Sequence, residues 1–323
     1  MAILDRPSQA LAWLGRHGTG AVAVSMLIGV AVPPLGALVR PYFSATVIAL
    51  LVLAFLRVDP AGLRTQLARP GLLAMAVVWT MLAIPALAGL GLVATGVAGL
   101  SPALLLALLL HTVAPPIFSS PALAALIGLN AALSLALLIV CLVATPFTAP
   151  AFVALFSGGE LTLSPLALGM RLGVILTGAA AAAWAVRRIA GKAWVERQSE
   201  RIDGLSVIGM FGFAVALTSN VLGNAIENPL LVFGLIALTT AVSVSVGALT
   251  AVTFLGAGRE SAFALAHANS CRNMGLMLAA TAGQMPELVW LYIGLAQFPT
   301  YLLPLAYKPL ARRLGLGKDI PTH

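Results

Sequence analysis

Apolar runs follow one another along almost the whole chain, separated by short polar segments. We predict ten membrane-spanning helices, at residues 22–39, 42–56, 71–93, 101–126, 131–156, 165–187, 204–222, 229–255, 261–282 and 287–308. Most of these runs approach or exceed the about 20 residues that a helix needs to cross a bilayer. They are longer than barrel strands and do not alternate between apolar and polar positions. The expected fold is an all-α polytopic membrane protein.

The composition narrows the function classes. Of 323 residues, 60% are hydrophobic and 9% are charged, against roughly 25% charged in soluble domains. A soluble fold of this size could not bury that much apolar surface. We therefore exclude a soluble enzyme, a nucleic-acid-binding domain and a disordered chain. The expected partners are the lipid bilayer and a small molecule, and no nucleic acid or protein partner is predicted.

The positive charges give the expected topology. With the ten spans above, all Lys and Arg residues except Arg40, Arg171 and Arg272 fall on one side of the membrane. Because cytoplasmic loops carry the excess of Lys and Arg, both termini are predicted to be cytoplasmic.

The order of the spans indicates an internal repeat. Five spans precede the loop around Glu160 and five follow it. An odd number of spans in each half inverts the second half in the membrane, as in many secondary transporters. We expect one transmembrane domain over residues 1–323, with one repeat at about 20–156 and the other at about 165–310. An offset of 153 residues relates Pro146 to Pro299 and Ser120 to Asn273.

The fourth span carries a helix-breaking sequence. Pro115 and Pro116 remove two backbone donors and clash with the preceding turn. Ser119 and Ser120 follow, and Ser120 with Pro121 is predicted to restart the helix as N-cap and first helical residue. Broken backbone inside a membrane is tolerated beside protein or water, so we expect a functional cavity there. The alternative is a kink used only for packing.

The ninth span is unusually polar. It contains His267, Asn269, Arg272 and Asn273, and the two asparagines are predicted to share one helix face. Arg272 keeps its charge at ordinary pH, and no Asp or Glu lies inside any predicted span beyond Glu287, the first residue of the tenth. The functional interpretation is a polar cavity in which the substrate is the counter-ion of Arg272. The alternative is that Arg272 reaches the interface or bonds to backbone carbonyls.

Three further ionisable residues are candidates. Arg171 in the sixth span could contact an anionic substrate or extend to the membrane interface. His111 and His267 could carry protons, since histidine titrates near neutrality, or could be neutral hydrogen-bonding residues.

The chain resembles the bile acid:sodium symporter family over about residues 20–310. The residues that carry the resemblance are the Pro115-Pro116 break, the segment Asn130–Ser134 and the segment Arg272–Leu276. The resemblance implies two inverted five-helix repeats in which helices 4 and 9 are broken and cross. It also implies a core of helices 3–5 and 8–10, a panel of helices 1, 2, 6 and 7, and a bacterial inner-membrane location. Substrates of the family are organic anions resembling bile acids, pantoate or keto acids.

The sequence departs from that family at the sodium ligands. The positions that hold sodium in the family correspond to Thr80, Ser120, Pro121, Ser134, Leu138, Ala268 and Arg272. The family glutamate corresponds to Ala268 and a family glutamine to Arg272, whereas the substrate-facing asparagine is retained as Asn273. Because a hard cation prefers several oxygens, including a carboxylate, we expect both sodium sites to be lost. No cofactor or other metal is expected.

Together these features predict a secondary active or facilitated transporter of a small organic anion, working by alternating access without sodium. Arg272 is expected to be a built-in cation that replaces sodium, and the chain is not expected to be an enzyme. The predicted substrate-binding residues are Pro115, Pro116, Ser119, Ser120, Arg171, His267, Asn269, Arg272 and Asn273.

Other classes remain open. One is an ordinary sodium:organic anion symporter, and another is a sensor of the same fold that does not transport. A cation/proton antiporter needs membrane-embedded acids. An intramembrane enzyme could use Ser119 or Ser120 with His111, although the chain has no Gly-x-Ser-x-Gly motif.

Overall fold

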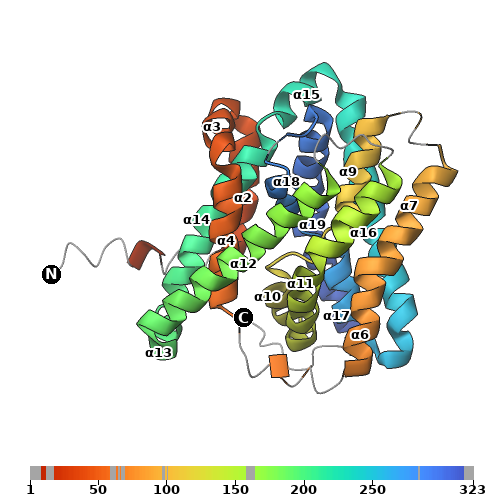
Figure 1. Ribbon diagram of the computed structural model, residues 1–323. Coiled ribbons are helices and arrows are strands. Elements are labelled where there is room, and N and C mark those ends of the chain that lie inside the picture. Colours follow the sequence, from red (N-terminus) through yellow and green to blue (C-terminus); the bar gives the residue numbers. More distant parts are fainter. Residues whose placement is uncertain are drawn as a thin grey trace. The chain divides into compact units, whose positions relative to one another are not determined.

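All named elements of the structure are helices (Figure 1). The computed structural model describes residues 9–11, 18–58, 63–64, 66, 70–96, 99, 101–157, 164–282 and 284–315. Within these residues the only β-pairing is a single bridge. The predicted cytoplasmic ends of the chain and the loop around Glu160 lie outside the described residues. The chain divides into two compact units, one of residues 1–58 and 173–232, the other of residues 59–172 and 233–323.

The first unit is organised around one central helix. Its elements are α2 (Gly18–Ala31), α3 (Pro33–Val39), η1 (Arg40–Tyr42), α4 (Phe43–Leu56), the later part of α12 (Pro165–Ala190), α13 (Lys192–Arg197), α14 (Ser199–Thr218), α15 (Val221–Glu227) and the start of α16 (Pro229–Phe254). Helix α14 packs against α2, α3 and α4. Added Cβ atoms on Gly29 and Gly36 would collide with Thr218 and Ser219 of this region. These glycines therefore permit close helix approach, as in other membrane helix interfaces.

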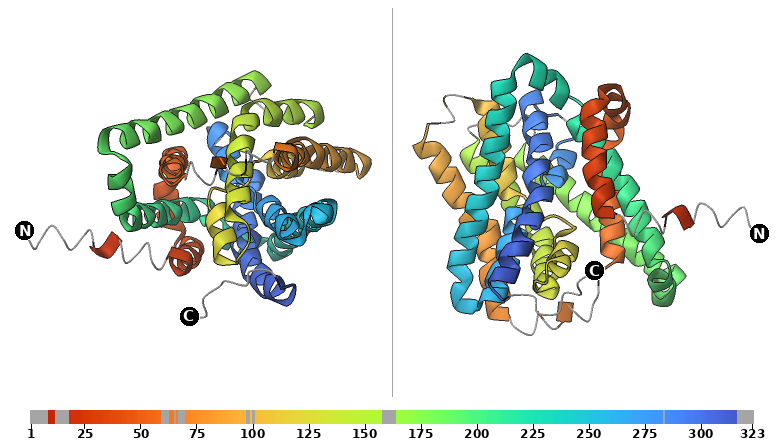
Figure 2. Two further views of the ribbon diagram at one scale, coloured as in Figure 1. Left: turned by 90° about the horizontal axis from the view of Figure 1, so that it is seen from below. Right: turned by 180° about the vertical axis from the view of Figure 1, so that it is seen from behind.

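The second unit contains the predicted breaks in spans 4 and 9. Its elements are α6 (Pro70–Val78), the π-helical turn η2 (Trp79–Ala83), α7 (Ile84–Ala94), α9 (Pro102–Val113), α10 (Ser120–Leu126), α11 (Ala131–Phe156), the start of α12, most of α16, η3 (Leu255–Ala257), α17 (Arg259–Ser270), α18 (Met274–Ala280) and α19 (Glu287–Arg313). Helix α9 packs against both α11 and α19, and α17 also packs against both (Figure 2). The short helices α9 and α17 thus each contact both long helices, α11 and α19.

Seven helices in the described part of the chain are long and apolar enough to cross a membrane. They confirm an all-α polytopic membrane protein. The first of them, Pro33–Leu56, combines the end of predicted span 1 with span 2, and the others correspond to the predicted spans 3, 5, 6, 7, 8 and 10. The other three predicted spans are each divided into two shorter helices: α2 and α3, α9 and α10, and α17 and α18.

The break in the first predicted span corrects our expectation of one continuous run over residues 22–39. Helix α2 ends at Ala31, and Val32 has φ −126° and ψ 70° before α3 begins at Pro33. A residue before proline is sterically driven out of the helical region. Pro33 and Pro34 therefore act here as Pro115 and Pro116 do in the fourth span.

Other prolines lie inside helices that continue without a break. Pro146 and Pro150 lie within α11, and Pro299, Pro304 and Pro309 lie within α19. Single prolines can remain in membrane helices because neighbouring groups satisfy the freed carbonyls. Paired prolines mark two of the three interrupted spans, whereas the break between α17 and α18 contains no proline.

The helices of the second unit recur at a nearly constant spacing. Helices α9 and α17 both have 12 residues, and their first residues are Pro102 and Arg259. Helices α11 and α19 have 26 and 27 residues and begin at Ala131 and Glu287. The spacing is therefore 156 to 157 residues, close to the offset of 153 expected from the sequence.

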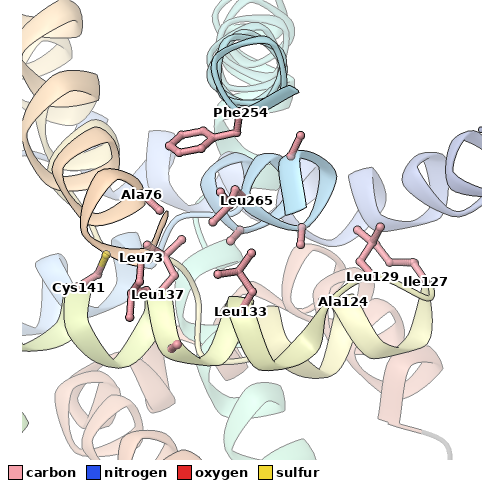
Figure 3. Close-up of a cluster of buried hydrophobic side chains, with 14 of the residues drawn as sticks. Leu73, Ala76, Ala124, Ile127, Leu129, Leu133, Leu137, Cys141, Phe254 and Leu265 are labelled. Carbon is pink, nitrogen blue, oxygen red and sulfur yellow. The ribbon is translucent and has the colours of Figure 1, made fainter. Parts of the chain in front are cut away.

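An apolar cluster joins the long helix α11 to α17 and α6 (Figure 3). Leu133 and Leu137 of α11, Leu265 and Ala268 of α17, and Leu73 of α6 are all at most 5% exposed. Because lipid is as apolar as these side chains, their contribution inside a membrane comes from van der Waals packing between the helices. The cluster fixes α17, and therefore the break that follows it, relative to α11.

Candidate functional site

The two predicted breaks in spans 4 and 9 are present, and they cross. The backbone N–H of Ile117 donates to the carbonyl of Cys271 at 3.0 Å, and that of Asn273 donates to the carbonyl of Pro115 at 2.7 Å. Between these bonds Pro116 and Arg272 form an antiparallel β-bridge. Segments far apart in the sequence are thereby joined through their backbones.

The chemistry of proline suits this pairing. In an antiparallel bridge, residue pairs alternate between those that exchange hydrogen bonds and those that do not. Pro116 and Arg272 occupy a pair of the second kind, flanked by the two bonds above. The missing N–H of Pro116 therefore leaves no bond unmade, while the proline ring prevents the helix from continuing.

Arg272 lies at the centre of the crossing. Its side chain is buried, with the residue 2% exposed. Nε donates to the carbonyl of Asn269 at 3.1 Å, and Nη1 donates to the carbonyls of Thr80 at 3.3 Å and Ala114 at 2.8 Å. The guanidinium thus binds backbone from α17, from the break after α9 and from the π-helical turn η2. π-Turns within helices are frequent at functional sites.

Several side-chain atoms of Arg272, of two residues whose carbonyls it binds and of the next residue in the chain are buried without a hydrogen-bond partner. They are Nη2 of Arg272, Oγ1 of Thr80, Oδ1 of Asn269 and Nδ2 of Asn273. Such atoms are rare in native structures because each costs roughly 1–3 kcal/mol. They include both donors and acceptors, so a polar ligand or solvent could satisfy them.

The two predicted site serines have different surroundings. The hydroxyls of Ser120 and Ser134 lie 2.9 Å apart and share a hydrogen bond, and both residues are fully buried. The expected cap at Ser120 is wrong by one residue, because Ser119 is the N-cap and α10 begins at Ser120 with Pro121 second. Ser119 forms no side-chain cap bond. The hydroxyl of Ser120 is instead bonded across to α11.

The predicted shared face of Asn269 and Asn273 is also wrong. Helix α17 ends at Ser270, and Cys271 has extended backbone, so helical periodicity does not continue to Asn273. Asn269 donates Nδ2 to the carbonyl of Leu265 at 3.0 Å. Asn273 is the N-cap of α18, since its Oδ1 accepts from the N–H of Leu276 at 3.1 Å. The two amides thus have separate structural roles.

Each buried histidine faces a tyrosine of α19. His111 Nδ1 lies 2.8 Å from the hydroxyl of Tyr292. The His267 ring packs edge-on against Tyr307 with centroids 5.5 Å apart, while the Tyr307 hydroxyl bonds to Ser270 at 2.8 Å. Neither ring nitrogen of His267 has a hydrogen-bond partner, although the residue is fully buried.

The positions that correspond to family sodium ligands offer few oxygens to a cation. Leu138 and Ala268 are apolar and buried, and Ala268 belongs to the apolar cluster that joins α11 to α17 and α6. The Ser120 and Ser134 hydroxyls are bonded to each other. The carbonyls of Thr80 and Ala114 bind the guanidinium of Arg272. A cation placed here would therefore meet a like charge and carbonyls that are already occupied.

Arg171 is not joined to the crossing by any described hydrogen bond. It lies on α12, two residues after Gly169, which packs closely against the carbonyl of Pro146 in α11. Nη1 of Arg171 is buried without a hydrogen-bond partner. The structure thus brings Pro115, Pro116, Asn269, Arg272 and Asn273 together, and leaves Arg171 on a separate helix.

Two features of the site were missed from the sequence. Tyr292 and Tyr307, which face the histidines, lie in an ordinary apolar run. Their hydroxyl groups in that run are the only sequence signal that could have indicated a role. The π-helical turn around Thr80 carries no recognised sequence signal.

The chain matches no protein-family model, and no curated protein is significantly similar to it.

Proposed function

We propose that this protein is a carrier of small organic anions that works by alternating access without sodium. The observation that carries the proposal is the Arg272 guanidinium, buried at the crossing of two broken helices. A buried charge needs a partner, and no Asp or Glu lies in the apolar runs of the sequence beyond Glu287 at the start of the last. A carboxylate or sulfate on the substrate supplies that partner.

The spacing of the helices supports an inverted repeat of two five-helix halves. Pro116 and Arg272 are 156 residues apart and pair with each other, and the flanking helices recur at 156 to 157 residues. Paired residues are therefore at equivalent positions of the two halves, as expected at a pseudo-two-fold axis. Transporters with such repeats bind substrate where the halves meet, at broken helices.

The division into two compact units supports a moving core. The unit of residues 59–172 and 233–323 holds both crossing breaks, and the other unit holds the predicted spans 1, 2 and 7 and most of span 6. This division matches the core and panel implied by the resemblance to bile acid:sodium symporters. We propose membership of that family, with ten helices and a bacterial inner-membrane location.

The geometry of Arg272 assigns it two tasks. A guanidinium has five N–H donors in a fixed planar fork. Three interactions, from Nε and Nη1, hold the backbone of α17, of the break after α9 and of η2. The donors on Nη2 have no protein acceptor and are free for an anion. Nε and Nη1 thus take the place of the sodium ion that the family resemblance implies, and Nη2 recognises the substrate.

The test is the melting temperature of the purified protein with pantoate, pyruvate and taurocholate, each measured in sodium and again in potassium. A ligand that binds only the folded state raises the melting temperature by mass action. We expect stabilisation by at least one anion, equal in both salts. Stabilisation only in sodium would favour an ordinary symporter, and none by any anion would refute the proposed substrate class.

Two variants locate the binding. Asn273→Asp keeps the cap oxygen for Leu276 but replaces the unpartnered Nδ2 by a negative oxygen. It should fold normally and lose the stabilisation by anions. Arg188→Gln, an exposed change on α12, is the matched control and should retain it. Equal stabilisation in Asn273→Asp and wild type would place the anion elsewhere.

A further inference from the structure

We infer that the Arg272 guanidinium makes transport electrogenic, so that an interior-negative membrane potential drives the organic anion out of the cell. The inference rests on the proposed function and adds the driving force and the direction. In a carrier that moves a cation with its substrate, the cation offsets the charge of the anion. Here the positive charge is part of the protein.

The guanidinium cannot leave with the substrate. Its three hydrogen bonds, between 2.8 and 3.3 Å, join it to backbone carbonyls of the same compact unit. At 2% exposure it is also shielded from solvent. When the anion dissociates, it therefore leaves alone, and the positive charge stays in the protein.

A co-transported cation has no site beside Arg272. The hydroxyls of Ser120 and Ser134 bond to each other, and Ala268 lies in an apolar cluster. Among the described residues no group of three or more His, Cys, Asp or Glu could hold a metal ion. Like charges a few ångströms apart in a medium of low dielectric repel strongly, so the guanidinium itself also opposes a second cation.

The same repulsion opposes coupling to protons. The two buried histidines lie on the helices that lead into the breaks, His111 on α9 and His267 on α17. His111 is bonded to Tyr292 and not to a carboxylate, so its protonation would bury a second positive charge without a counter-ion. His267 packs against the ring of Tyr307, which offers no carboxylate either. The net charge moved per transport cycle is therefore that of the anion.

The sign of this charge fixes the direction. At equilibrium, the concentrations of a monovalent anion that moves alone differ tenfold between the two sides of the membrane for every 59 mV of membrane potential. The side with positive potential holds the higher concentration. In a cell with a negative interior, that side is the outside, so the protein is an exporter at equal concentrations. In a symporter that carries one sodium ion per monovalent anion, the accumulation of the anion does not depend on the membrane potential. In one that carries two sodium ions, a negative interior drives the anion into the cell.

The experiment uses the full-length protein in liposomes, with the potential set by potassium gradients and valinomycin and with no sodium. Labelled pantoate, pyruvate and taurocholate are tested separately. We expect accumulation of the transported anion in vesicles with a positive interior, about tenfold per 59 mV, and depletion at negative potential. Collapse of a pH gradient should leave this ratio unchanged. Empty liposomes and the Asn273→Asp protein are the controls.

The outcomes separate the two proposals. Uptake that is independent of potential, that needs sodium or a pH gradient, or that occurs only in exchange for an internal anion would overturn the electrogenic mechanism and leave anion transport intact. If none of the three anions binds or crosses under any condition, the proposed function itself fails.

Discussion

Replacement of Arg272 by lysine should destabilise the protein more than replacement by methionine, although lysine keeps the charge. The guanidinium donates to three carbonyls from separate chain segments, at 2.8, 3.1 and 3.3 Å. The lysine ammonium is a single, compact and strongly hydrated group on a flexible stem. It cannot reach all three carbonyls, yet it leaves a full charge buried in the same place.

The structure gives the size of the difference. A hydrogen bond to a charged group contributes about 1.5–3 kcal/mol, so losing two of the three costs about 3–6 kcal/mol in Arg272→Lys. Arg272→Met leaves carbonyls unpaired, at about 1–3 kcal/mol each. It also removes a buried charge, whose desolvation costs several kcal/mol. These terms of opposite sign bring Arg272→Met to within about 2 kcal/mol of wild type.

The assay is thermal unfolding of wild type and both variants in one detergent. Matched changes at the exposed Arg188 on α12 serve as controls and should shift stability by less than about 0.5 kcal/mol. The expected order is wild type and Arg272→Met close together, with Arg272→Lys clearly below. If the lysine variant is as stable as wild type and the methionine variant is the weaker, then the guanidinium is solvated and the reasoning fails.

Three further predictions concern stability in the second unit. A Cβ on Gly247 of α16 would collide with Ser270 and Tyr307, so Gly247→Ala should cost about 1–3 kcal/mol. Gly234→Ala on the same helix meets nothing within 4 Å and should be neutral or slightly stabilising; equal melting temperatures for the two would contradict the close packing. Tyr292→Phe leaves Nδ1 of His111 without its hydrogen-bond partner and should lower stability by about 1–3 kcal/mol. No change in a denaturation experiment would contradict a contribution from this hydrogen bond. Asn273→Ala removes the cap of α18 and should cost about 0.5–2 kcal/mol, whereas a change no larger than that of Asn273→Asp would argue against the cap.

Local chemistry accounts for what could be predicted about the fold. The Pro115-Pro116 break follows from missing donors and ring clashes, which act on neighbouring residues. The break before Asn273 was expected only from the family resemblance, because the polar residues there were interpreted as one helix face. The same reasoning applied to Pro33 and Pro34 would have found the interruption at Val32, but the unbroken apolar run there hid it.

The contacts of the site could not be predicted in the same way. The expected face shared by Asn269 and Asn273 assumed a helix through residue 273, and the pairing of the two breaks ended that helix at Ser270. The carbonyls that bind Arg272 come from residues as distant as Thr80. Composition and periodicity report neighbours along one helix, whereas these partners are set by how separate helices pack.

The bridge between Pro116 and Arg272 also has a consequence for biogenesis. The two residues are 156 positions apart, and a ribosome adds roughly 5–20 residues per second. The first break therefore enters the membrane about 8–30 s before its partner exists. During that interval the carbonyls of Ala114 and Pro115 must be satisfied by other groups, because unpaired backbone is costly in lipid. A newly inserted first half is thus the state in which this protein most needs a chaperone or the shelter of the insertion machinery.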